Sequence, residues 1–278
     1  MLTRNSGTSR RTMTESQPTS TKYQFVAFCI LGYTFATLAL IYVVIEHRLR
    51  PPPIEPPTVV VTPDFAAIES VSERKAAFFD YLNPLIAEQN QLLQQQRLAL
   101  VKIQHSLLND QPLTAPQLLQ FAELRRQFVI DEELSKEDAL QELLLRVDQL
   151  PAAMVLAQAA MESAWGTSRF ARLANNYFGQ WCFNTGCGLV PAHRPAGARH
   201  EVRRFESVTE AVAAYFHNIN THRAYIELRS LRALRRRAKQ PLEGPVLVAG
   251  LEKYSTKGSA YIEELRAIIR VNDLTQYN

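Results

Sequence analysis

PAAMVLAQAAMESAWG, residues 151–166, is the stretch that decides how the C-terminal part of this chain folds. Before its tryptophan, the only polar side chains are those of Gln158, Glu162 and Ser163. A helix that is apolar on nearly every face lies inside a protein. The proline at the start favours a first helical turn, and the closing glycine favours a helix end. The stretch therefore predicts a buried helix that contains a single carboxylate.

The carboxylate of Glu162 has no local partner. Gln158 lies one turn before it on the same face, and no lysine or arginine stands three or four residues away. A buried carboxylate is costly unless it is paired, protonated or open to a cleft. Two explanations stay open. One is a distant ion pair, for example with Arg169 or Arg172. The other is a carboxyl with a raised pKa, which is what a general acid requires.

Composition excludes several classes of protein. The 278 residues are 46% apolar and 21% charged, which rules out a wholly disordered chain, a collagen and a small disulfide scaffold. The net charge of +4 comes from 31 basic and 27 acidic residues, too small an excess to indicate a nucleic-acid partner. No motif predicts a cofactor or a metal ion.

Residues 25–45 predict a transmembrane helix. They contain no charged side chain, and 21 residues would span roughly 31 Å, close to the thickness of a bilayer core. A cleaved signal peptide is the main alternative, although its apolar region is usually shorter. The basic residues before the stretch are Arg4, Arg10, Arg11 and Lys22, and those soon after it are Arg48 and Arg50. We therefore expect a single pass through the inner membrane, a cytoplasmic N-terminus and a periplasmic remainder.

The segments around this span differ in composition. Residues 1–22 are rich in Ser, Thr and Arg and predict a disordered cytoplasmic tail. Residues 51–63 hold six prolines and predict an extended linker. Residues 64–146 have helical spacing of apolar side chains and predict a helical stem. Residues 147–278 contain both tryptophans and predict the domain that carries the chemistry.

Local signals divide the predicted stem into helices. Pro84 predicts an early end or kink of the first helix. A second helix is expected over 115–129, after a cap at Thr114, and a third from Ser135. Further along, Ser207 followed three residues later by a glutamate predicts a capped helix start.

Three motifs in residues 147–278 resemble one family. They are AQAAMESAWG at 157–166, NNYFG at 175–179 and YSTKGSAY at 254–261. Together they are similar to the bacterial Bax-like proteins, which belong with the FlgJ-type glucosaminidase domains of glycoside hydrolase family 73. The resemblance implies a mainly α, lysozyme-like fold with a small β-hairpin near 180–190. It also implies hydrolysis of N-acetylglucosaminyl bonds in peptidoglycan glycan strands.

The resemblance also implies roles for individual residues. Glu162 matches the catalytic glutamate and would donate a proton to the leaving oxygen. Tyr254 would line the cleft and help to position the substrate or a water. The expected substrate-binding residues are Gln158, Trp165, Asn176, Tyr177, Phe178 and Gly179.

The second carboxylate that glycosidases commonly use has no clear match. Glu201 is the nearest candidate, whereas Glu210 is explained by the predicted cap at Ser207. The aspartate of the family's late motif is replaced by Lys257. Two alternatives to hydrolysis therefore stay open. One is a lytic transglycosylase with the same acid, and the other is a protein that binds peptidoglycan without cutting it.

Two cysteines and a run of basic residues give the remaining predictions for residues 147–278. Cys182 and Cys187 are close in sequence, and in an oxidising compartment they predict a disulfide that clamps a hairpin. A zinc site would need His193 or His200 as further ligands and is the weaker interpretation. The basic residues between 223 and 239 predict a solvated helix face.

Overall fold

A computed structural model describes residue 37, residues 61–192 and residues 194–278. The predicted tail at 1–22, the predicted span at 25–45 and most of the predicted linker at 51–63 lie outside these residues, as does His193. None of the helices that the structure does describe is long and apolar enough to cross a membrane.

The central element is α5, Ala152–Ser163, and it confirms the helix expected from the sequence. Residues 152–160 are buried throughout, and helices α2 and α10 pack against this helix. Pro151 is the N-cap rather than the first helical residue. The chain leaves α5 through three consecutive residues with positive φ, Ala164, Trp165 and Gly166.

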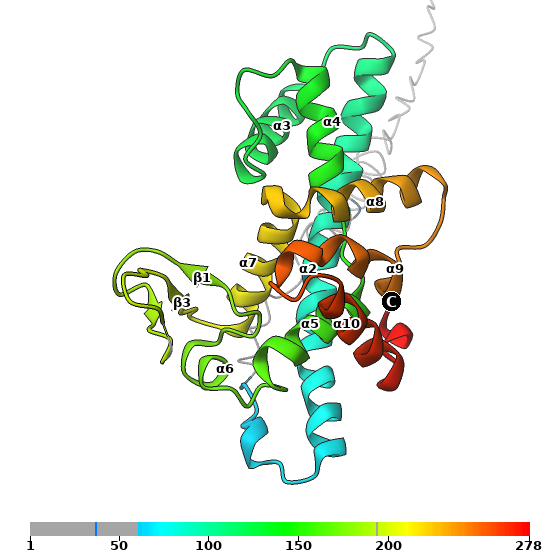
Figure 1. Ribbon diagram of the computed structural model, residues 1–278. Coiled ribbons are helices and arrows are strands. Elements are labelled where there is room, and N and C mark those ends of the chain that lie inside the picture. Colours follow the sequence, from blue (N-terminus) through cyan, green and yellow to red (C-terminus); the bar gives the residue numbers. More distant parts are fainter. Residues whose placement is uncertain (1–36, 38–60, 193) are drawn as a thin grey trace, which may run out of the picture. The chain divides into compact units, whose positions relative to one another are not determined.

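α2, Val71–Leu108, is one helix of 38 residues that extends from α5 toward α3 and α4 (Figure 1). Of the early end or kink expected at Pro84, the end is wrong, because α2 contains this proline and continues past it. The buried side chains of α2 are Phe78, Phe79, Leu82, Leu85, Ile86, Leu93, Leu100 and Ile103. They join the same apolar core as α5, so burial of that core outweighs the one backbone hydrogen bond that a proline removes.

Three predicted helix starts are confirmed by their caps. Thr114 opens α3, Ala115–Gln127, with a reciprocal capping box. Ser135 opens α4, Lys136–Arg146. Ser207 opens α7, Val208–Thr221, where the Ser207 hydroxyl accepts from the N–H of Glu210.

The remaining elements cover α5 and form a small sheet beside it. The sheet consists of β1, Trp181–Cys182, β2, Gly188–Leu189, and β3, Glu201–Arg203, with β3 between the other two and antiparallel to both. The strands lie to one side of the helical body, next to α6, Arg169–Ala174 (Figure 1). The last helices are α8, Ile226–Arg237, α9, Gly244–Leu247, and α10, Ser259–Val271. Short 3-10 helices are η1, Phe65–Ala67, η2, Arg223–Tyr225, η3, Val248–Tyr254, and η4, Leu274–Tyr277.

A buried arginine joins α8 to the end of α4. Arg232 is 1% exposed and donates to the Oδ1 of Asn220 at 2.7 Å. It also donates at 3.0–3.3 Å to the backbone carbonyls of Leu145, Arg146, Asp148 and Gln149. Burial alone would raise the pKa of Asp148, but a hydrogen bond from Arg236 and the charges of Arg232 and Arg97 hold that pKa below its ordinary value.

The expected solvated face between 223 and 239 is therefore wrong for part of the run. Arg229 and Arg232 are buried, and both donate to backbone carbonyls near the ends of helices, among them those of Ile219 and Asp148. Arg237 and Lys239, near the end of the run, are exposed as expected.

Replacing Arg232 should destabilise the fold strongly. Arg232→Met leaves several buried carbonyls without a hydrogen-bond donor and removes one of the positive charges that balance Asp148. We therefore expect a loss of roughly 3–5 kcal/mol of unfolding free energy. Arg237→Met, on the exposed side of the same helix, is the matched control and should cost less than about 0.5 kcal/mol. Urea denaturation measures both. Equal stabilities of the two variants would contradict the role given to Arg232.

Candidate active site

Glu162 lies in the last turn of α5, and its side chain is half-buried. Its Oε1 accepts a hydrogen bond of 3.0 Å from the hydroxyl of Tyr261 in α10. Within the part of the chain that the structure describes, no hydrogen bond or ion pair reaches the other oxygen, Oε2. Arg169 and Arg172, the distant partners considered from the sequence, bind Val190 and Asp64 instead. Glu162 is therefore a carboxyl with one oxygen held and the other unpaired.

A chain of buried hydrogen bonds fixes the donor that faces Glu162. The hydroxyl of Tyr215 donates to the Oε1 of Gln158, so the amide nitrogen of Gln158 faces the other way. That nitrogen donates to the oxygen of Tyr261 at 2.9 Å. The Tyr261 oxygen has thereby accepted a bond, and its own hydrogen points to Glu162. Gln158 is fully buried, so its function is to orient Tyr261 and not to contact a substrate.

The electrostatic surroundings favour the protonated form of Glu162. Burial raises the pKa of this carboxyl, and it outweighs the hydrogen bond from Tyr261 and the charge of Lys257, both of which lower the pKa. Lys257 is partly neutralised, because its ammonium binds both oxygens of Glu264 at 2.8 and 2.9 Å. The residue that replaces the family's aspartate thus acts on Glu162 only through its charge.

The loop after α6 brings a glycine to the unpaired oxygen. A Cβ on Gly179 would lie 3.3 Å from the Oε2 of Glu162, and the φ of this glycine is +64°. Asn176 holds the loop in place. Its Nδ2 donates to the carbonyls of Gln180 and Arg203 at 2.8 Å, and its Oδ1 accepts from the N–H of Gln180 at 3.0 Å. Gly179 thus leaves room beside the carboxyl, as only a residue without a side chain can.

Aromatic side chains pack against Tyr261, the residue that binds Glu162. Tyr254 stacks on Tyr261, with ring centroids 5.6 Å apart, and its hydroxyl donates to the carbonyl of Phe178 at 2.7 Å. Phe178 stacks on Tyr215 at 4.2 Å. Tyr177 and Phe178 are each 1% exposed. These rings support the site from inside.

Several residues expected to bind substrate are therefore placed differently by the structure. Gln158, Asn176, Tyr177 and Phe178 have buried side chains that position the site without facing it. Trp165 packs edge-to-face on Phe78 and Phe79 of α2, and the Lys75 ammonium lies 4.5 Å from its ring centre. Of the expected binding residues, Gly179 is the one whose position adjoins the carboxyl of Glu162.

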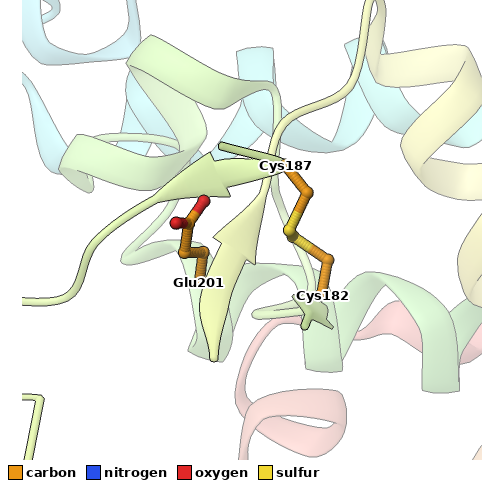
Figure 2. A group of neighbouring side chains, drawn as sticks. All are labelled: Cys182, Cys187 and Glu201. Atoms are coloured by element: carbon orange, nitrogen blue, oxygen red, sulfur yellow. A yellow bond between two sulfur atoms is a disulfide. The ribbon is translucent and has the colours of Figure 1, made fainter. Parts of the chain in front are cut away.

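Glu201 lies in the small sheet. Among the described residues it makes no contact with Glu162. Its two oxygens accept from the N–H groups of Gly186 and Gly188 at 3.1 and 2.8 Å, and these bonds hold its pKa below the ordinary value. Cys182 and Cys187 form a disulfide across the loop that joins β1 and β2 (Figure 2). The hairpin expected near 180–190 is wrong, because these two strands pair with β3 and not with each other. The three side chains are close enough to resemble a metal site. However, sulfur atoms that are bonded to each other are not thiolate ligands. Glu201 and the disulfide thus hold the loop between β1 and β2 in place.

Sequence reasoning missed the functions of Tyr215 and Tyr261. Tyr261 is the last residue of the late family motif, but the role in the site was expected for Tyr254, the first residue of that motif. The spacing of Gln158 and Glu162 was the available signal, because two polar groups on one buried face require buried donors. It does not identify those donors, which lie 57 and 103 residues from Gln158.

A mainly helical fold with a small sheet, and a half-buried acid at the end of its central helix, fits a lysozyme-like domain. Comparison with known proteins identifies the family. The glucosaminidase family model, described as mannosyl-glycoprotein endo-beta-N-acetylglucosaminidase, matches residues 138–274. Protein bax of Escherichia coli (strain K12) is 35% identical over 210 residues, which cover 76% of this chain and 74% of that protein. No solved structure matches.

The chain therefore belongs to the glucosaminidase family. It is a glycoside hydrolase of the endo-β-N-acetylglucosaminidase type, and its substrate is a glycan.

Proposed function

We propose that this enzyme cleaves N-acetylglucosaminyl bonds in the glycan strands of peptidoglycan, with Glu162 as the general acid. One observation carries the proposal. Glu162 is a carboxyl of raised pKa with no cationic side chain bonded to it among the described residues, and its Oε2 lies beside Gly179, where a Cβ would approach it to 3.3 Å. The family resemblance of the motifs around Glu162 supports peptidoglycan as the substrate.

The hydrogen-bond chain gives the two oxygens of Glu162 different functions. Because Tyr261 donates to Oε1, the proton of the acid form resides on Oε2. A glycosidic oxygen beside Gly179 would receive this proton as the bond to the sugar breaks. The carboxylate that remains is stabilised by Tyr261 and by the charge of Lys257. Tyr254 acts as a positioning residue, since its ring backs Tyr261.

The group that completes the reaction differs between the candidate mechanisms. Glu201 is engaged by two backbone N–H groups, which makes a hydrolytic base there less available. A water activated elsewhere, or the acetamido group of the substrate, would complete hydrolysis. A lytic reaction needs no second carboxylate, because a hydroxyl of the substrate itself attacks and its proton passes to Glu162, which has become a carboxylate by donating its own. It stands as the second candidate because of those two bonds to Glu201.

Glu162→Gln should reduce cleavage of purified sacculi at least about a hundredfold, because an amide cannot donate the proton. Glu206→Gln, an exposed glutamate on the surface, is the matched control and should cleave at the wild-type rate. Mass spectrometry of the products identifies the reaction. Reducing N-acetylglucosamine ends indicate hydrolysis, and anhydro-muramic ends indicate the lytic reaction. Wild-type activity of Glu162→Gln would eliminate the proposed acid.

Tyr261→Phe should shift the alkaline limb of the pH–rate profile to higher pH. The Tyr261 hydrogen bond favours the carboxylate, so its loss raises the pKa of Glu162 further, and the acid form persists to higher pH. The maximal rate should fall, because Glu162 loses its orientation. Tyr277→Phe, which removes a hydroxyl that makes no described hydrogen bond to Glu162, is the control and should leave the limb in place. A limb that moves to lower pH, or does not move, would contradict the proposed function of Tyr261.

We also propose that residues 25–45 anchor the enzyme in the inner membrane, with residues 1–22 in the cytoplasm and residues 61–278 in the periplasm. The uncharged stretch of 21 residues and the basic residues before it support this topology. Washing membranes with alkaline carbonate should leave the full chain in the bilayer fraction. Its release into the wash would argue against the anchor.

A further inference from the structure

Two large aromatic side chains are exposed in β1 and in the loop that follows it. Trp181 in β1 is 57% exposed, and Phe183, which follows the strand, is 70% exposed. The aromatic rings around Glu162 are by contrast buried or half-buried in the core. Keeping apolar rings in water forgoes the free energy of burial, and such rings commonly mark a binding surface.

The indole of Trp181 has one covered face and one open face. It stacks on the imidazole of His200, with centroids 4.1 Å apart and planes 15° from parallel. Contact on one face together with 57% exposure leaves the other face to solvent. A ring fixed in this manner presents a flat apolar surface, which suits the C–H face of a sugar ring.

The backbone beneath these rings is fastened at several points. Trp181 pairs with Val202 of β3, and the disulfide closes the turn that carries Phe183 (Figure 2). Glu201 binds the far side of the same turn through Gly186 and Gly188. A surface that is ordered before binding loses little conformational entropy when a ligand arrives.

The surface formed by Trp181 and Phe183, which we call the platform, adjoins the proposed acid, Glu162. Gly179 lies beside the Oε2 of Glu162, and Trp181 is two residues further along. Two residues span at most about 7 Å between Cα atoms. A glycan strand bound with one bond at Glu162 therefore has its neighbouring sugars within reach of Trp181.

We propose that Trp181 and Phe183 form a sugar-stacking platform that binds N-acetylglucosamine-containing glycan beside the bond to be cleaved. This inference rests on the proposed function, because it takes the glycan strand as the ligand. Trp181 supplies most of the binding, since its ring is already oriented by His200. Phe183 extends the surface along the turn.

The test measures binding of peptide-free glycan strands from sacculi to the full chain carrying Glu162→Gln, which cannot cut them. In this parent, Trp181→Ala should weaken binding roughly tenfold. Trp181→Phe retains a ring and should bind close to the parent value. Leu119→Ala, which removes an apolar side chain that is 75% exposed on α3, is the matched control and should bind as the parent does.

Tryptophan emission supplies a second measurement, since the chain has two tryptophans, Trp165 and Trp181. Glycan should shift the emission of the parent, and Trp181→Phe should abolish the shift while binding persists. Parent-like affinity of Trp181→Ala, or a shift that survives Trp181→Phe, would overturn the platform. A wild-type chain that binds through Trp181 yet cleaves nothing would instead overturn the proposed function alone.

Discussion

The position of a single carboxyl in α5, the most apolar helix between residues 61 and 278, governs much of the surrounding architecture. α5 is covered by α2, α9, α10 and η4, and residues 152–160 have no appreciable contact with water. Glu162 ends this helix, where complete burial would require a partner for each oxygen. The structure supplies a partner for one oxygen and leaves the other beside Gly179. The burial that stabilises the core therefore also raises the pKa that acid catalysis needs.

Two of the buried polar networks of the enzyme have different functions. Tyr215, Gln158 and Tyr261 orient a reactive group, and they contain no charge of their own. Asp148 and Arg232 connect helices, and their charges offset each other. Because the first network is neutral, it leaves Glu162 without a close cation and its pKa stays high. A buried arginine in that place would have stabilised the carboxylate and removed the acid.

Local signals in the sequence identified much of this arrangement. The apolar run predicted α5, the caps at Thr114, Ser135 and Ser207 were confirmed, and the family was identified from three short motifs. Each of these signals lies within a few residues of what it predicts. The helix end predicted at Pro84 is wrong because tertiary packing outweighs one missing hydrogen bond. The interior position of Arg232 could not be predicted, since its carbonyl acceptors lie more than 80 residues away.

The residues around Glu162 show the same limit. Gln158 and Asn176 belong to family-like motifs and were therefore expected to contact substrate. Such motifs can also contain residues that support a site without touching the substrate. Burial distinguishes a support from a contact, and burial is a property of the folded chain. The platform at Trp181 lies outside the quoted motifs, and its exposure is visible only in three dimensions.

The packing of Phe65 against the end of α5 has a mechanical consequence. A Cβ on Gly166 would lie 2.4 Å from the Phe65 ring, so the two segments are in close contact. Phe65 also packs on Phe78, in a helix of 38 residues that is roughly 57 Å long. A force that reached Phe65 along the chain would therefore act on α2 and on the end of α5, where Glu162 lies.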